Sequence, residues 1–297
     1  MVRGTFLLLA ILLAGCNDFL AQRMVAPPNG GAPVDVLFAL PGETTRRIPV
    51  GPPSATVAAW IREPASAPRG TILLLHGFLN DHSQLESAAQ NLESAGYRTV
   101  SIDLRGHGHS TGDFITYGID DARDLVQITD YLEKEHLCGG EVGVYGTSYG
   151  AATAILYAGA DPRVKAVVAV APFDSLRAEA PYFGKHILPV PGLFLSPQDF
   201  ADIVNRMGRI AQFDPDAQTP LTAIRKTTAH VRLFHGDADL ITPSDCSRRL
   251  AAADPDRTEL TILKGQGHLE LSFDPFGELH VQTRDWFDHY LGAALPQ

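Results

Sequence analysis

Ser148 has the residue type and the setting that nucleophilic catalysis needs. It stands in the run Gly146-Thr147-Ser148-Tyr149-Gly150, directly after a short apolar run and directly before an alanine-rich helical segment. A turn this tight between strand and helix strains the backbone at the serine, and it needs glycines where side chains would meet the crossing chain. It also holds the hydroxyl at a helix N-terminus, which favours developing negative charge. A glycine-rich turn with an incidental serine is the alternative, and it leaves this strand–turn–helix context unexplained.

The base that would activate this serine has to be selected by position, because the sequence contains 11 histidines. A serine hydroxyl is a weak nucleophile and needs a base within hydrogen-bond reach. His268 follows the last predicted strand, in a loop before the C-terminal helix. Loops that leave the carboxyl ends of parallel strands meet at one face of a sheet, so His268 is predicted to lie beside Ser148. His280 falls inside the following helix and points elsewhere.

The acid that orients the base is expected in the run His235-Gly236-Asp237-Ala238-Asp239, which leaves another predicted strand. This run lies between the serine and the histidine in the chain, the order expected for such a site. Asp237 directly follows the strand and is expected to cap or brace the turn. Asp239 lies two residues further out, where it can reach an imidazole in the neighbouring loop. Asp239 is therefore predicted to orient His268.

Two backbone N–H groups are predicted to form an oxyanion hole. Tyr149 follows the nucleophile, so its amide faces the developing oxyanion. The second donor is expected from the run His76-Gly77-Phe78-Leu79-Asn80, which follows a buried strand. Gly77 lets the chain turn sharply and leaves the Phe78 amide free to point at the same oxygen. His76 is expected to be structural, bonding the loop backbone.

The elements that position these residues alternate along the chain between apolar β-branched runs and segments of helical periodicity. Runs that are apolar throughout are typical of strands buried on both faces, so the pattern predicts an α/β fold with a mostly parallel, doubly wound sheet flanked by helices. The expected strands are Thr56–Arg62, Gly70–His76, Arg98–Asp103, Glu141–Gly146, Val164–Ala171, His230–His235 and Glu259–Leu263. The expected helices are Ser83–Ala95, Ile119–Glu135, Tyr149–Ala158, Ser244–Ala253 and Gly277–Leu291.

One long interval, about residues 177–229, interrupts this alternation with prolines, glycines and aromatic residues. Long segments inside a compact domain are usually functional lids. We expect a small, mainly helical cap, with Phe183 and Phe194 among the side chains able to reach over Ser148. The domain as a whole is expected to span residues 34–297.

The N-terminus has the layout of a secretory signal, with a basic start, an apolar run and small residues. The run Leu13-Ala14-Gly15-Cys16 resembles a bacterial lipobox. The resemblance implies that residues 1–15 are a lipoprotein signal peptide, that Cys16 is diacylated, and that the protein is extracytoplasmic and anchored to a bacterial membrane by lipid. The alternative is a secreted protein with an unmodified cysteine. Residues 16–33 are rich in Pro, Gly, Asn and Ala and are predicted to be a tether.

The amino-acid composition limits the kinds of partner that the protein is expected to bind. Lysine and arginine number 24 against 34 acidic residues, and the net charge of −10 argues against nucleic acid as a partner. No later run approaches the roughly 18 apolar residues that a membrane-spanning helix needs.

The turn Asp103–Ser110 and the run Phe114-Ile115-Thr116-Tyr117-Gly118 resemble the branch of bacterial esterases, monoacylglycerol lipases and peptidases of the prolyl-oligopeptidase type. Five motifs together resemble the α/β-hydrolase superfamily to which that branch belongs. They are His76-Gly77-Phe78, Asp103-Leu104-Arg105-Gly106-His107-Gly108-His109-Ser110, Gly146-Thr147-Ser148-Tyr149-Gly150, His235-Gly236-Asp237-Ala238-Asp239 and Gly267-His268. The resemblance implies that Arg105, His107 and His109 brace the floor of the site and are not catalytic. Cys138 and Cys246 are expected at opposite ends of such a sheet, too far apart to form a disulfide.

The combined prediction is a membrane-anchored serine hydrolase that cleaves small-molecule carboxylic esters through an acyl-enzyme intermediate. No cofactor or metal is implied. A serine peptidase or amidase with the same residues is the nearest alternative, because the leaving group is not encoded in Ser148, Asp239 and His268. A non-catalytic lipoprotein with a hydrolase fold is the alternative from another class.

Overall fold

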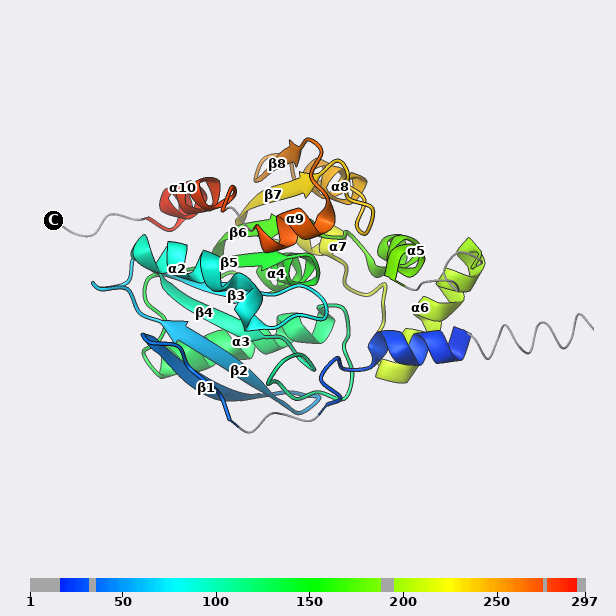
Figure 1. The fold of residues 1–297 in the computed structure, drawn as a ribbon, viewed down its shortest axis with the longest axis horizontal. Helices are drawn as coiled ribbons and strands as arrows, with labels where there is room; N and C mark the ends of the chain where they lie inside the picture. Colours follow the sequence, from blue (N-terminus) through cyan, green and yellow to red (C-terminus); the bar gives the residue numbers. More distant parts are fainter. Residues whose placement is uncertain (1–16, 32–35, 188–194, 275–276, 293–297) are drawn as a thin grey trace, which may run out of the picture.

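The computed structural model describes residues 17–31, 36–187, 195–274 and 277–292. Within these ranges the backbone forms one eight-stranded sheet with helices on both faces (Figure 1). The strands are β1 (Glu43–Val50), β2 (Ala55–Arg62), β3 (Gly70–Leu75), β4 (Arg98–Asp103), β5 (Glu141–Thr147), β6 (Val164–Val170), β7 (His230–Gly236) and β8 (Thr258–Leu263).

The sheet is mostly parallel, in the order β1-β2-β4-β3-β5-β6-β7-β8. β2 runs antiparallel to β1 and β4, and the remaining neighbours pair in parallel. The predicted doubly wound α/β sheet is therefore confirmed. The register places Leu75 beside Gly146 and Thr147 beside Val170, so the segments after β3, β5 and β6 leave the sheet at the same edge.

β1 is the strand that the sequence did not reveal. It pairs with β2 over its full length at the edge of the sheet. Its sequence, ETTRRIPV, is mostly polar and only partly buried, so it lacks the continuous apolar run that marks the inner strands.

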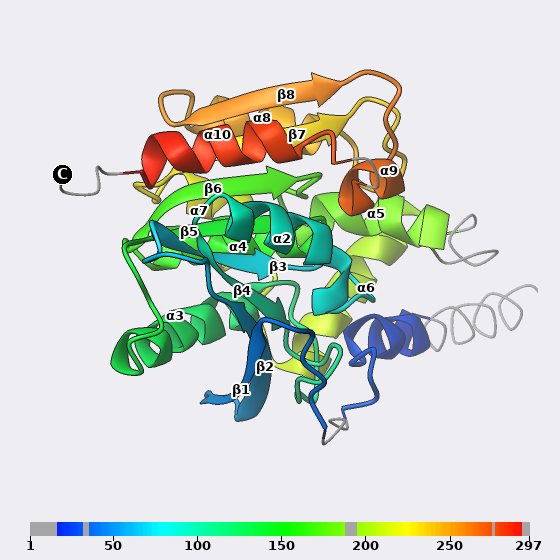
Figure 2. The same cartoon turned by 60° about the vertical axis from the view of Figure 1, so that its left-hand side comes forward.

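Helices cover both faces of the sheet (Figure 2). One face is covered by α3 (Ile119–Lys134), α4 (Tyr149–Ala160), α7 (Pro220–Ile224) and α8 (Asp245–Ala253), which contact one another. The other face is covered by α2 (Glu86–Ser94) and α10 (His280–Tyr290). α4 is buried along nearly its whole length, because it is the central helix of its layer. None of the described helices is long and apolar enough to cross a bilayer.

The described part of the cap interval is helical. α5 (Leu176–Ile187) and α6 (Pro197–Ala211) pack on each other and extend beyond the carboxyl ends of the strands (Figures 1 and 2). α7 instead packs against α4 and α8, so it belongs to the layer that covers the sheet.

The two described cysteines are both free, as expected from the topology. Cys246 is fully buried on α8, and Cys138 is partly buried ahead of β5.

The prediction of a tether over residues 16–33 is wrong for the described residues 17–31. Residues 17–25 are helical, and Leu20 and Met24 are buried in the main hydrophobic core. The Tyr117 hydroxyl donates to the Met24 carbonyl at 2.9 Å, and the Asn29 side-chain amide donates to the Ser110 carbonyl at 2.7 Å. Composition suggested a linker, but the apolar residues recur at helical spacing and form one buried stripe.

This docking predicts that Met24→Ala lowers the free energy of unfolding by about 2 kcal/mol or more, because it removes a buried side chain. Phe19→Ala is the matched control, since Phe19 lies on the same helix but is 61% exposed. Chemical denaturation of both variants measures the difference. Equal stability of the two variants would mean that the helix does not pack on the domain.

Candidate active site

The backbone turn at Ser148 has the predicted strained geometry. Ser148 adopts φ 52° and ψ −114°, outside the ordinary regions for a residue with a side chain. A Cβ on Gly146 would lie 2.3 Å from the Gly150 carbonyl oxygen, and a Cβ on Gly150 would lie 2.1 Å from the Leu75 carbonyl oxygen. Both glycines are therefore required by the crossing of backbone between β5, β3 and α4.

The structure brings the three predicted catalytic side chains into one hydrogen-bonded chain. Ser148 Oγ lies 2.9 Å from His268 Nε2, and His268 Nδ1 lies 2.6 Å from Asp239 Oδ2. An ionised carboxylate can only accept, so Nδ1 carries the proton and Nε2 is left to accept from the serine. One detail differs from expectation, because His268 opens the short helix α9 (His268–Phe273) and does not lie in a loop.

The Asp239 carboxylate is held by the backbone of its own loop. The backbone N–H groups of Ile241 and Thr242 donate to Asp239 Oδ1 at 2.9 and 2.8 Å. Burial alone would raise the pKa of Asp239, but the hydrogen bonds from His235 and His268 outweigh burial and hold that pKa well below its usual range. The carboxylate is therefore charged at neutral pH. Asp237 accepts from the Gly265 N–H at 2.6 Å, which confirms that it braces the turn.

The two predicted oxyanion donors lie in loops that meet beside Ser148. In the described part of the chain, no protein acceptor takes the N–H of Phe78 or of Tyr149. The preceding Gly77 N–H is held by Gln84 Oε1 at 2.7 Å, and a Cβ on Gly77 would lie 3.6 Å from the Ser148 Cβ. The loop is thus fixed close to the nucleophile. The Gly77 N–H is bonded to Gln84, and the Phe78 N–H is left without an acceptor among the described residues.

His76 is structural, as expected. Its Nδ1 donates to the Gly77 carbonyl at 2.8 Å, and its Nε2 accepts from the Leu104 N–H at 3.0 Å. Burial, followed by the neighbouring His107, lowers the pKa of His76 to about 4, so the ring is neutral.

Two acids of α3, Asp121 and Asp124, support the turn at Ser148 and the loop after β4. The sequence did not identify them. The Tyr149 hydroxyl donates to Asp121 Oδ2 at 2.7 Å, and the Arg105 N–H donates to Asp121 Oδ1 at 2.9 Å. The Arg105 guanidinium binds both oxygens of Asp124, at 2.7 and 2.8 Å. This network confirms that Arg105 braces the floor of the site. The sequence carries no signal for these contacts, because an acid near a helix N-terminus is favourable there whether or not another element contacts it.

Glu179 on α5 is a second feature that the sequence did not reveal. Its Oε1 accepts from the Thr242 hydroxyl at 2.7 Å, while its Oε2 is buried with no hydrogen-bond partner among the described residues. Burial raises the pKa of Glu179 to about 8, and the charge on Asp239 acts in the same direction. A protonated acid from the cap thus supports the loop that holds Asp239.

A cavity of about 190 Å³ opens above Ser148. Its described lining is Gly77, Phe78, Leu79, Asn80, Gln84, Ser148, Phe183, Ile241, His268, Leu269, Ser272 and Phe273. No carboxylate, lysine or arginine is among these residues. Phe183 comes from α5 and packs edge-on against Phe78, with ring centroids 5.2 Å apart. Phe194 lies outside the described residues.

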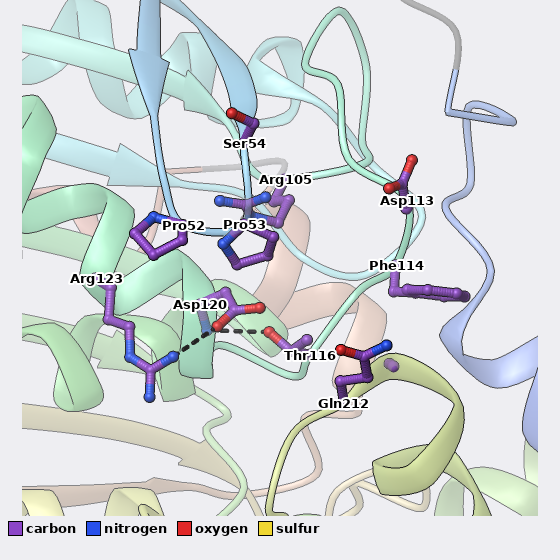
Figure 3. Close-up of a pocket in the computed structure, with 11 residues that line it drawn as sticks. Pro52, Pro53, Ser54, Arg105, Asp113, Phe114, Thr116, Asp120, Arg123 and Gln212 are labelled. Atoms are coloured by element: carbon purple, nitrogen blue, oxygen red, sulfur yellow. Dashed lines mark hydrogen bonds and ion pairs between the residues drawn. The ribbon is translucent and has the colours of Figure 1, made fainter.

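A larger cavity of about 380 Å³ lies elsewhere and contains none of the predicted catalytic residues (Figure 3). It is formed by the turn between β1 and β2, the loop after β4, the start of α3 and the end of α6. Figure 3 shows Arg123 pointing to Asp120, with which it forms a 3.0 Å ion pair. The catalytic geometry belongs to the smaller cavity.

This fold and these motifs define the class as an α/β-hydrolase-fold serine hydrolase. A family model described as X-Pro dipeptidyl-peptidase (S15 family) matches residues 56–250, and the chain belongs to that family. The Bacillus subtilis protein YqkD, itself uncharacterised, is 30% identical over 191 residues, which are 61% of this chain and 58% of that protein. A monoacylglycerol lipase of Mycolicibacterium smegmatis is 29% identical over 221 residues, which are 63% of this chain and 76% of the lipase.

Solved structures show the same fold at low identity. An esterase of Pyrococcus furiosus superposes with a TM-score of 0.68 at 16% identity, covering 88% of this chain and 100% of the esterase. An acylaminoacyl peptidase of Pyrococcus horikoshii superposes with a TM-score of 0.61 at 17% identity, covering 87% of this chain and 43% of the peptidase. Esterases and peptidases are thus both among the structural neighbours.

The buried Glu179 predicts a pH dependence of stability. Between about pH 4.5 and 8 the unfolded chain loses this proton while the folded protein keeps it, so the free energy of unfolding falls as pH rises. Glu179→Gln keeps an acceptor for the Thr242 hydroxyl but cannot titrate. It should therefore remove the contribution of Glu179 to this fall in the free energy of unfolding, which is at most about 1.4 kcal/mol per pH unit.

Denaturation at pH 5 and pH 8 tests this, with Glu278→Gln as the control because Glu278 is exposed. The wild type and the control should lose more stability between the two pH values than Glu179→Gln does. Parallel losses in all three proteins would contradict a buried, protonated Glu179.

Proposed function

We propose that the protein hydrolyses carboxylic esters through an acyl-enzyme intermediate formed on Ser148. The observation that carries the proposal is the hydrogen-bonded chain from Ser148 through His268 to Asp239. His268 Nε2 takes the serine proton as Oγ attacks the ester carbonyl, and Asp239 stabilises the imidazolium that forms. His268 then protonates the leaving alcohol. Water, activated by the same histidine, releases the acyl group and restores the serine.

The Phe78 and Tyr149 amides are proposed to bind the oxyanion of each tetrahedral intermediate. Both follow the ends of β3 and β5, where hydrogen bonds to Gln84 and Asp121 hold the chain, so little reorganisation is needed when charge develops. A donor of this kind typically contributes about 10²–10³ in kcat.

The lining of the cavity above Ser148 favours esters with an apolar acyl group. Phe78, Phe183 and Ile241 form apolar walls, and Leu79, Leu269 and Phe273 are 60%, 59% and 47% exposed at the same cavity. A free peptide terminus would instead call for a fixed opposite charge, which the described lining does not supply. The similarity to a monoacylglycerol lipase agrees with this choice.

Peptide or amide hydrolysis is the second candidate, and the S15 family description favours it. The same three side chains would cleave an amide if the leaving amine were protonated by His268. A kinetic panel of p-nitrophenyl acyl esters beside aminoacyl anilides separates the two. The proposal predicts higher kcat/KM for the esters, with a preference for acyl chains longer than acetyl. Faster cleavage of the anilides would reverse the assignment.

The catalytic assignment predicts that Ser148→Ala abolishes both hydrolysis and labelling by a fluorophosphonate probe. Asp239→Asn should lower kcat by about 10⁴-fold, because an amide favours the wrong imidazole tautomer. Asp237→Asn is the matched control and should retain most activity, since Asp237 contacts a turn and not the imidazole. If Asp237→Asn is the more damaging change, the acid is misassigned. Failure of the wild type to react with the probe would favour a non-catalytic protein.

We further propose that Cys16 is diacylated and holds the protein at a bacterial membrane, outside the cytoplasm. The support is the Leu13-Ala14-Gly15-Cys16 run in the sequence. The described helical residues 17–25 follow this cysteine in the sequence and pack beside α6 (Figure 1), where Asn17 donates to Asp202 at 3.2 Å. Without a tether, the lipid would hold the cap side of the domain against the bilayer.

Cys16→Ser is expected to leave the precursor uncleaved and to abolish incorporation of labelled palmitate in cells. The wild type should partition into detergent, because several acyl chains on one residue give stable anchoring. A wild-type protein that takes up no palmitate and remains in the aqueous phase would show that Cys16 is unmodified.

A further inference from the structure

Two histidines and one buried aspartate converge at a place that the proposed reaction does not use. His82 begins the short helix η1 (His82–Leu85), Asp103 ends β4, and His109 lies in the loop that follows β4. His82 Nδ1 is 2.9 Å from Asp103 Oδ1, and His109 Nδ1 is 3.1 Å from Asp103 Oδ2. One ligand atom from each residue lies within 4.8 Å of the other two.

The backbone holds this cluster in place independently of the imidazoles. The His82 N–H donates to Asp103 Oδ1 at 2.7 Å, and the His109 N–H donates to Asp103 Oδ2 at 2.7 Å. Gly108, at φ 48°, lets the loop wrap so tightly that a Cβ there would lie 2.2 Å from Asp103 Oδ2. Each oxygen of the carboxylate is therefore fixed opposite one histidine.

Trp60 fixes the orientation of both rings. It stacks on His82 with centroids 3.4 Å apart and meets His109 edge-on at 5.3 Å. Trp60 is itself 1% exposed, and its Nε1 donates to the Phe38 carbonyl at 2.8 Å. The buried indole therefore limits the positions that both imidazole rings can take beside Asp103.

The charge at the cluster suits a cation. Asp103 is fully buried, and no arginine or lysine is hydrogen-bonded or ion-paired to it among the described residues. Asp81 adds a second carboxylate, with Oδ1 3.9 Å from His82 Nδ1. Among the described residues, the cluster therefore combines two imidazoles with two carboxylates, and the nearby Arg47 guanidinium donates to the His109 carbonyl at 3.4 Å and not to Asp103.

We propose that His82, Asp103 and His109 form a binding site for a divalent transition-metal ion, with Zn²⁺ as the best match. Two imidazole nitrogens and a carboxylate are a ligand set that Zn²⁺ accepts, whereas Mg²⁺ and Ca²⁺ prefer oxygen ligands. On binding, the proton of each Nδ1 moves to the same ring's Nε2. The freed Nδ1 lone pairs and Asp103 then hold the ion.

The ion would stabilise a loop and would take no part in the proposed ester hydrolysis. His82 lies in the segment from His76 to Leu85, which carries the Phe78 amide and the Gln84 side chain that holds Gly77. A metal ion would therefore tie this segment to the end of β4 and stabilise the folded state.

Titration of the full chain in detergent, after treatment with a chelator, tests the site with Zn²⁺ alone and a competing chromophoric indicator. One equivalent of Zn²⁺ should bind the wild type and raise its Tm, and Mg²⁺ should do neither. His82→Gln and His109→Gln should each weaken Zn²⁺ binding by tenfold or more and remove the rise in Tm. His289→Gln is the matched control, because His289 is an exposed histidine outside the cluster.

X-ray absorption of the Zn²⁺-loaded wild type keeps the proposal testable if a variant fails to fold. It should show imidazole scattering and nitrogen or oxygen ligands at about 2.0–2.2 Å. Absence of stoichiometric Zn²⁺ binding by the wild type would overturn the proposal and leave Asp103 as a carboxylate satisfied by four N–H donors. Full binding by either cluster variant, or a spectrum without imidazole, would overturn it as well.

Discussion

The close crossing of backbone at Ser148 is the constraint on which the site depends. The first turn of α4 lies so near the end of β3 that a Cβ on Gly150 would lie 2.1 Å from the Leu75 carbonyl oxygen. Ser148, two residues earlier, has a positive φ and lies beside the loop that follows Leu75. The close approach of α4 to the end of β3 thus positions both the nucleophile and the Phe78 amide. The strain at Ser148 is sustained because β5 and α4 are both buried in the core.

Buried acids determine how that strained turn is supported. Asp121 joins the Tyr149 hydroxyl to the loop after β4, so the residue following the nucleophile is tied to α3. Asp239 is charged because donors surround it, whereas Glu179, which has only the Thr242 hydroxyl, has a raised pKa and keeps its proton. Two carboxyl groups near one loop therefore differ in charge, because burial raises the pKa of Glu179 against a single donor, whereas several donors outweigh burial at Asp239.

The cap and the N-terminal helix connect the site to the rest of the proposed function. α5 contributes both Phe183 to the cavity wall and Glu179 to the acid loop, so substrate contact and acid positioning share one helix. α6 packs on α5 and also receives the helix over residues 17–25. A lipid on Cys16 would accordingly restrain the orientation of the cap as well as the location of the protein.

The sequence by itself determined the inner strands, the parallel sheet and the residues Ser148, Asp239 and His268. These features depend on local signals, such as glycines at a tight turn, apolar runs and the position of a residue directly after a strand. Tertiary structure decided the rest. The helix over residues 17–25 was mistaken for a tether because its burial depends on Tyr117 and α6, which are distant in the chain. The roles of Asp121, Glu179 and the His82–Asp103–His109 cluster likewise arise from contacts between separate elements. The spacing of residues along one segment does not show which side chains of a distant segment will pack against it.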